Sequence, residues 1–320
     1  MKDLYLDPNL NVNEIRGGKL PQHIIVKTLD QIRLLSSQLE SSITSSQLSI
    51  WQNTPLLQAL ELFSTQSNKS LAHRVLAGQN SALDTLLALF RSSLPQDMSS
   101  GSPSDQTGLF PVAVASIGAL ADLLCNQGDL IVNRQADFER LVSVVTQAAA
   151  LQSDNAKSRV SGLVANNLRA LRNCCEMHEG NRDVVAALHL LESAVRLMQT
   201  WEPLANAHKS TNASCAVSAD ASCANSMRCS SSAPSASAVL VEASRLLRAF
   251  TVDDDPRVPF CRAHDRARLL VENTPALELA LRLCNGSSPV CCFHSPFIKQ
   301  QPLRLSSYNA RSNANDSVFR

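Results

Sequence analysis

Apolar residues recur at the spacing of an α-helix in nearly every periodic stretch of this 320-residue chain. Residues three and four positions apart share one face of a helix, whereas a half-buried strand alternates at every second residue. We find no convincing alternating run bounded by turn residues. The prediction is an all-α fold, with apolar stripes such as Leu83, Leu86, Leu87 and Phe90, Val164, Leu168, Leu171 and Cys175, and Leu240, Ala243, Leu246, Leu247 and Phe250.

The helical stripes also repeat as a group. SLAHRVLAGQNSALDTLLALF (70–90) reads as a short helix, a glycine at Gly78 and a longer leucine-rich helix, and NRDVVAALHLLESAVRLM (181–198) has the same plan. The sequence pattern aligns Leu83, Leu86, Phe90 and Arg91 with Phe138, Leu141, Val145 and Thr146, and with Leu188, Leu191, Val195 and Arg196.

Another apolar helix precedes the second and third of these pairs, at 111–125 and 158–175. A recurring unit of three helices that cannot bury its own apolar face must stack on its neighbours, which is the defining property of a solenoid. We therefore expect an irregular array of about four units, with loops of different lengths between them.

Two segments resemble a known family. LRALRNCCEMHEGNRDVV (168–185) is similar to the armadillo-repeat pattern A-L-x-N…N-R…V. LRAFTVDDDPRVPFCRAHDRARLLVEN (247–273) resembles a segment of the armadillo repeat-containing protein 6 family, in which an aspartate run, R-V-P-F and a His-containing helix start follow in that order. The resemblance covers roughly residues 65–284 and implies a right-handed α-solenoid, the α-α superhelix of armadillo proteins.

The chain departs from the family pattern in three places. Leu188 stands near the position of a family glycine, a Ser/Ala tract is inserted, and the last residues have no helical stripe, so the chain resembles a product truncated at its C-terminus. The expected organisation is a partly helical N-terminal segment (1–54), an armadillo-like domain (55–284) and an irregular or disordered tail (285–320). Within the domain, 92–108 and 204–237 are expected to be loops or disordered insertions, because neither carries an apolar stripe.

The aspartate run 253–255 invites a metal or active-site interpretation. Pro256 and Pro259 follow it closely, and a proline inside the first turns disfavours a continuous helix, so the next sustained helix should start near Asp265. A calcium loop needs alternate acids, a glycine and a distal glutamate at fixed spacing, and DDDPRVP does not have that spacing. We interpret the run as a structural corner between two helices rather than a cation site.

The ten cysteines indicate reduced thiols of an intracellular protein, because no secretory signal is visible. None of the cysteine groups has the paired C-x-x-C spacing of a zinc site. Cys175 belongs to an apolar stripe and is expected to be buried. The other groups considered are Cys174 with His178, Cys291 and Cys292 with His294, Cys215 with Cys223 and Cys229, and Cys261 with His264.

The chemistry-bearing patterns of common enzymes are missing from the sequence. A nucleophile and base such as Cys261 and His264 would need an orienting group and an oxyanion donor, and the chain offers neither. No phosphate loop, nucleophile elbow or H-E-x-x-H motif occurs. The prediction is a non-enzymatic protein without a cofactor or catalytic metal.

A binding surface remains. In armadillo proteins generally, third helices line a groove for extended peptides, and the polar position after the last apolar anchor is here Arg91, Thr146 and Arg196, with Asn285 beyond the last helix. Such a groove would suit a partner protein or peptide with some acidic character, although ordinary solvated positions would look the same. Trp51 and Trp201 are expected outside the third helices, which argues against the tryptophan ladder of nuclear import receptors.

Partners of other classes are disfavoured by charge and hydropathy. Lys plus Arg (29) nearly balances Asp plus Glu (28), unlike a nucleic-acid binder, and the longest uncharged apolar run, 109–121, is too short to cross a membrane. The expected function is an intracellular scaffold or adaptor, cytoplasmic, nuclear or both. The alternative is an incomplete structural fragment, monomeric or self-associating through an uncapped C-terminal repeat.

Overall fold

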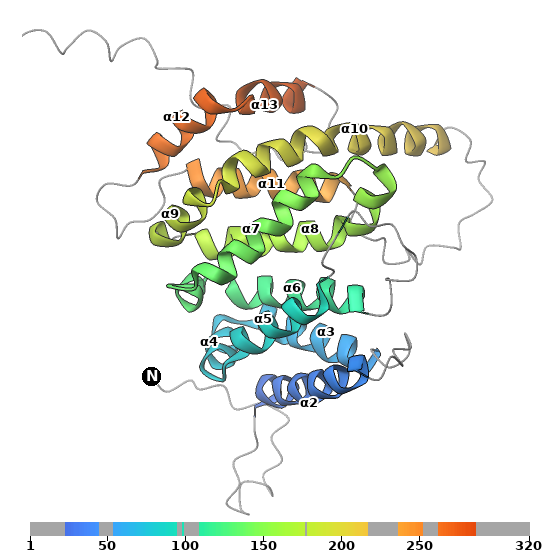
Figure 1. Cartoon of the computed structure of the whole chain (residues 1–320), viewed down its shortest axis with the longest axis vertical. Coiled ribbons are helices and arrows are strands. Elements are labelled where there is room, and N and C mark those ends of the chain that lie inside the picture. Colours follow the sequence, from blue (N-terminus) through green and yellow to red (C-terminus); the bar gives the residue numbers. More distant parts are fainter. Residues whose placement is uncertain are drawn as a thin grey trace, which may run out of the picture.

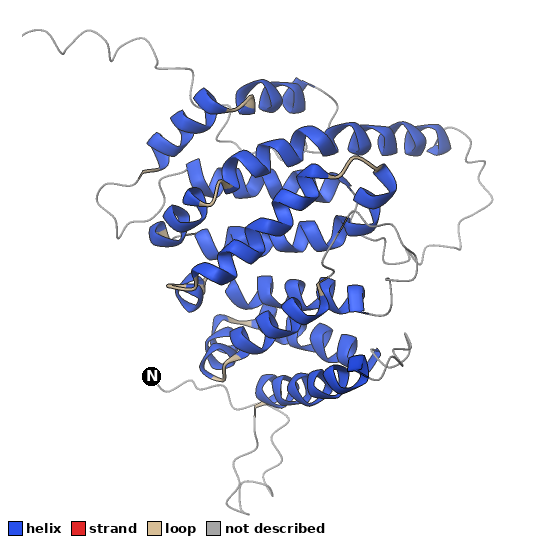
Figure 2. Ribbon diagram, viewed as in Figure 1, coloured by secondary structure: helices blue, strands red, loops and turns tan. Residues whose placement is uncertain are grey.

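The computed structural model describes residues 23–44, 54–94, 98, 109–176, 178–216, 236–251 and 262–285. Every regular element in these ranges is a helix, and Figure 2 shows no strand in the described part of the chain. The described part of the chain is all-α, as its apolar periodicity predicts, and its stacked helices agree with the resemblance to armadillo repeats. None of the described helices is both long and apolar enough to span a bilayer.

After helix α2 (Ile24–Thr44), the described elements form four successive units of three, in which one member is the 3-10 turn η3. Helix α2 packs against α3 and α4 through buried residues such as Ile25, Leu29 and Ile32. The units are α3 (Thr54–Lys69), α4 (Leu71–Gln79) and α5 (Ala82–Ser93); α6 (Leu109–Leu124), η3 (Gly128–Ile131) and α7 (Gln135–Ala150); α8 (Asp154–Cys175), α9 (Glu179–Ala187) and α10 (Leu190–Ala216); and α11 (Ala236–Thr251), α12 (Ala263–Asn273) and α13 (Ala276–Asn285).

The first helices of the units stack directly on one another. Helix α3 packs on α6, α6 on α8 and α8 on α11, and Figure 1 shows them one above another along the long axis. Each third helix also packs on the first helix of the next unit, at α5–α6, α7–α8 and α10–α11. One continuous apolar core therefore runs through the array, as expected when no unit buries its own face.

The second unit has only a 3-10 turn, η3, where the others have a second α-helix. Gly128 begins this turn and lies against α8. A Cβ atom at Gly128 would be 2.7 Å from the carbonyl oxygen of Cys174, closer than ordinary van der Waals contact allows. The missing side chain thus permits the second and third units to approach, and Asn181 Nδ2 bridges them by donating to the Gly128 and Cys174 carbonyls at 2.9 and 2.8 Å.

The end of α10 differs from the sequence-based expectation. The helix continues to Ala216, through the first part of the 204–237 stretch that was expected to be a loop, and Pro203 lies inside it. Leu204 and Ala205 are buried, so apolar packing stabilises the beginning of this segment, although the residues that follow are mostly polar. The remainder of that stretch up to 235, most of 92–108 and the tail from 286 lie outside the described residues.

Candidate functional site: the third-helix surface

The three predicted groove residues lie on third helices of consecutive units. Arg91 is in the last turn of α5, Thr146 is in the second half of α7, and Arg196 is in the second turn of α10. All three side chains are exposed. We refer to the exposed side of α5, α7 and α10 as the third-helix surface.

Burial corrects the register that the sequence pattern assigned to α10. One pattern of buried positions fits all three helices, and it aligns Arg91 with Thr146 and with half-buried Gln199 rather than with Arg196. Arg196 lies three residues earlier, one helical turn away on the same side. The aligned buried sets are Ala82, Leu83, Leu86, Leu87, Leu89, Phe90 and Ser93; Asp137, Phe138, Leu141, Val142, Val144, Val145 and Ala148; and Leu190, Leu191, Ala194, Val195, Leu197, Met198 and Trp201.

The turn before each third helix explains this shift. A residue other than glycine adopts the left-handed conformation just before α5, α7 and α10, at Ser81 (φ 57°), Asn133 (φ 63°) and His189 (φ 58°). Leu188, which the sequence pattern used as the first anchor of the third helix, is instead the C-cap of α9. The turn that a glycine would form at no steric cost is therefore made by His189, immediately after Leu188.

Trp201 also corrects an expectation, because it lies within third helix α10. Its side chain is fully buried, and its indole Nε1 donates to the carbonyl oxygen of Ala148 at 3.1 Å. A buried indole that bonds a neighbouring backbone fastens α10 to the end of α7 and presents no ring to a ligand. Trp201 is therefore part of the core, and Trp51 lies outside the described residues.

A depression of about 280 Å³ lies beside Thr146, between α7 and the turn that leads into α10. We call it the third-helix depression. The hydroxyl groups of Thr146 and Ser193 are 3.1 Å apart and hydrogen-bonded, which joins α7 to α10 next to it. Its lining combines two apolar side chains with short polar ones and one carboxylate, namely Val142, Leu188, Ser143, Thr146, Gln147 and Glu139.

The arginines of the third-helix surface differ in how far their charge is already paired. Arg91 Nη1 lies 3.7 Å from Asp137 Oδ1, and Arg134 bridges Asp84 at 2.7 Å and Asp137 at 3.6 Å, so alternating charges connect α5 to α7. Arg196 has no hydrogen bond or ion pair with any described residue. Of the predicted groove residues, Arg196 therefore carries the positive charge most available to a partner.

The cysteines and histidine at the end of α8 are part of the scaffold. Cys174 and Cys175 are both fully buried, and burial raises the pKa of each thiol far above its ordinary value. His178 Nδ1 accepts a hydrogen bond from the backbone N–H of Asn181 at 3.1 Å and so caps α9, while Nε2 lies 3.1 Å from Asp129. These groups supply neither an exposed thiolate nor a free metal ligand.

Most of the remaining sequence candidates lie outside the described residues. The aspartate run 253–255 with both prolines, Cys261, and the tail cysteines with His294 lie outside the described residues, as do Cys223, Cys229 and the side chain of Cys215. Helix α12 begins at Ala263, two residues before the expected start. Within the described ranges, no three His, Cys, Asp or Glu side chains are grouped so that they could hold a metal ion.

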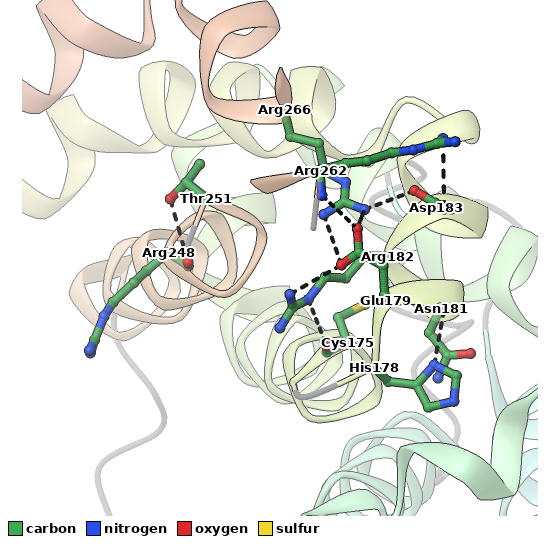
Figure 3. Close-up of polar contacts among 10 residues, drawn as sticks. All are labelled: Cys175, His178, Glu179, Asn181, Arg182, Asp183, Arg248, Thr251, Arg262 and Arg266. Carbon is green, nitrogen blue, oxygen red and sulfur yellow. Dashed lines mark hydrogen bonds and ion pairs between the residues drawn. The ribbon is translucent and has the colours of Figure 1, made fainter. Parts of the chain in front are cut away.

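A buried charge network that the sequence analysis missed connects the second helices of the third and fourth units (Figure 3). Glu179 on α9 accepts from Arg182 at 3.3 Å, from both terminal nitrogens of Arg266 on α12, and from the backbone N–H of Arg262 at 3.2 Å. Arg266 also bonds Asp183 at 2.8 Å. Arg182 is fully buried and Arg266 is 6% exposed, so the network is an internal fastening rather than a binding surface.

The signal for this network was an arginine recurring at the fourth position of the second helix, at Arg74, Arg182 and Arg266. Arg74 donates to the Ser67 carbonyl at 2.9 Å, and Arg182 donates to the Cys175 carbonyl at 2.8 Å, in each case seven residues back. The repeated contact satisfies a carbonyl at the end of the preceding first helix, which an α-helix leaves without an internal partner.

Comparison with known proteins supports the resemblance seen in the sequence. The chain is 28% identical over 279 residues to "Armadillo repeat-containing protein 6 homolog" of Drosophila melanogaster, which covers 84% of this chain and 45% of that protein. It is 27% and 25% identical to "Armadillo repeat-containing protein 6" of Pongo abelii and Homo sapiens, covering 83% of this chain and 40% of each. The chain thus spans less than half the length of these relatives. No family model and no solved structure matches it.

Proposed function

We propose that this chain is a non-enzymatic protein-interaction module that holds an extended, acidic segment of a partner protein on its third-helix surface. The similarity to armadillo repeat proteins supports a repeat-based interaction scaffold. The more specific assignment, to Arg91, Thr146 and Arg196 as contact residues, is our inference from their exposure on α5, α7 and α10.

The third-helix depression is the observation that carries this proposal. It places apolar Val142 and Leu188 beside the hydroxyl of Thr146, a combination that accepts a small or medium side chain and a polar backbone group together. Arg196 lies one helical turn from Ser193, whose hydroxyl group is hydrogen-bonded to Thr146. The charge of Arg196 therefore lies near this contact between α7 and α10. An extended peptide seated in the depression would carry its acidic residue toward Arg196.

An intracellular location, cytoplasmic, nuclear or both, fits the state of the described cysteines. Cys125, Cys174 and Cys175 are unpaired, and the last two are adjacent and buried in the core. A core built around reduced thiols is typical of proteins in reducing compartments. The location is part of the proposal and rests on this thiol chemistry alone.

The proposal is tested with fluorescently labelled ten-residue peptides that differ only in carrying glutamate or lysine at every third position. The full chain should bind the glutamate series more tightly, and Arg196→Glu should weaken that binding about three- to tenfold, since a charge at the rim of an interface contributes modestly. Arg248→Glu is the matched control, because Arg248 is exposed on α11 and pairs with no described side chain. Equal loss in both variants, or none in Arg196→Glu, would remove this surface from consideration.

A second candidate, self-association of the chain, is favoured by apolar side chains on the fourth unit. Leu269, Val271, Leu277 and Leu281 are each about half exposed on α12 and α13. In the preceding units the third helix packs on the next first helix, so an apolar face here is suited to a further helical layer. Light scattering of the full chain against the double variant Leu277→Glu, Leu281→Glu decides: only a self-associating wild type made monomeric by the substitutions supports this candidate.

A further inference from the structure

A second depression, of about 630 Å³, lies on the first helices α3, α6 and α8 and shares no lining residue with the third-helix depression. We call it the first-helix depression. Its volume is within the range of ligand-binding clefts, and its walls come from three consecutive units. It is therefore a candidate binding surface distinct from the third-helix surface.

Small side chains on the middle helix α6 contribute to the depression. Helix α6 presents Ala115 and Gly118 at its floor, where larger side chains would fill the space. A Cβ atom at Gly118 would be 3.1 Å from Asn166 Nδ2, so the side chains of α8 lie directly over this surface. Asn166 and Arg169 hold that position by donating to the α6 carbonyls of Val114 and Gly118 at 3.2 and 3.1 Å.

The floor offers apolar contact to an occupant. Leu57 on α3 and Phe110 and Val114 on α6 line the depression and are only half-buried, although each packs against the apolar core on its other side. Because the walls are α-helices, their backbone groups are bonded within the helices and cannot add a strand from a partner. Side-chain packing is the recognition that remains, which is the helix-in-groove mode.

The rims of the depression carry opposite charges that are not paired with other described residues. Arg159 on α8 and Glu61 on α3 are exposed, and neither forms a hydrogen bond or ion pair with another described residue. Arg169, by contrast, lies 3.3 Å from buried Asp122, which also accepts from Ser64, so this inner pair is already neutralised. The two open charges flank the apolar floor from different helices.

We propose that the first-helix depression binds an amphipathic helix of a partner protein. The helix places its apolar side chains over Leu57, Phe110 and Val114, an acidic residue toward Arg159 and a basic residue toward Glu61. The complementary pair of rim charges defines the occupant as a helix with one acidic and one basic edge. This site is separate from the third-helix surface and does not depend on the proposed function.

The test uses three hydrocarbon-stapled helical peptides with one shared leucine face. The mixed peptide has a glutamate edge and a lysine edge, the acidic peptide has glutamates on both edges, and the basic peptide has lysines on both. By fluorescence anisotropy, the full chain should bind the mixed peptide about three- to tenfold more tightly than the others. Arg159→Glu should move the preference to the basic peptide, and Glu61→Lys should move it to the acidic peptide.

Three further measurements keep the interpretation specific. Ala115→Trp should lower the affinity for the mixed peptide more than tenfold by filling the floor, with folding checked by circular dichroism, whereas Arg196→Glu should leave it unchanged. Equal affinity for all three peptides, or binding unaffected by both rim substitutions, would overturn the proposal. A dimer in the absence of peptide that Arg159→Glu dissociates would also overturn it, because the occupant would then be a second copy of the chain.

Discussion

Glu179→Ala removes the carboxylate at the centre of the network that joins α9 to α12. Glu179 is 8% exposed and accepts hydrogen bonds from Arg182, Arg266 and the backbone of Arg262. The substitution removes the carboxylate that Arg182 Nη1 contacts at 3.3 Å and the bonds of Arg266 to Glu179, while the bond of Arg266 to Asp183 remains. Two buried arginines each lose a contact with a carboxylate, which water cannot replace at this depth.

The expected loss in free energy of unfolding is about 3 kcal/mol. Removing one partner of a buried ion pair costs roughly 3–5 kcal/mol, and the remaining contact between Arg266 and Asp183 places this case near the lower limit. Since domains are stable by only about 5–15 kcal/mol, the effect is large. It should fall first on the fourth unit, because a solenoid unit is held only by its neighbours.

Urea unfolding followed by circular dichroism measures the total change, and native-state hydrogen exchange locates it. Amides of α12 should lose protection by roughly 100-fold, the equivalent of about 3 kcal/mol, while those of α3 and α6 change little. Glu278→Ala is the control, since Glu278 forms an exposed pair with Arg282 at 2.8 Å that is worth about 0.3–0.5 kcal/mol. If Glu179→Ala lowers stability no more than this control does, the buried network does not fasten the fourth unit.

Two further substitution experiments test the core. Gly128→Ala should lower the free energy of unfolding by about 1–3 kcal/mol, because its Cβ would lie 2.7 Å from the Cys174 carbonyl oxygen. Gly180→Ala is the control in helix α9, where the nearest neighbour of the added Cβ is 3.5 Å away, and it should be neutral or stabilising. Equal effects of the two substitutions on thermal unfolding would contradict the close approach at Gly128. Burial raises the pKa of Cys174 and Cys175, so the unfolded chain loses these protons at lower pH than the folded one. The free energy of unfolding should therefore fall above about pH 8.5, by up to about 1.4 kcal/mol per pH unit for each thiol. In urea titrations between about pH 8.5 and 10.5, the double variant Cys174→Ala, Cys175→Ala should lose stability less steeply with pH. An unchanged dependence on pH would show that folding does not hinder ionisation of the two thiols.

The register of α10 shows how a correct pattern can be assigned to the wrong residues. Leu188, Leu191 and Val195 have helical spacing, and so do Leu191, Ala194 and Met198. Shifting a helix by three residues moves each position by about one turn, which keeps the apolar stripe on the same side. Only the turn at His189 and the burial of the helix decide that Gln199, and not Arg196, aligns with Arg91.

Helix class, unit order and the core face of the helices with a clear apolar stripe follow from the sequence alone. Apolar residues at a period of 3.6 have one way to be buried, and each unit needs its neighbours to bury them. The tertiary structure decided the features that depend on residues distant in the chain. It extended α10 past Pro203, buried Trp201 against Ala148, and brought Glu179 to Arg266 across 87 positions. It also opened the two depressions, which lie between helices of different units. Such contacts depend on how neighbouring units pack, and local periodicity does not specify that packing.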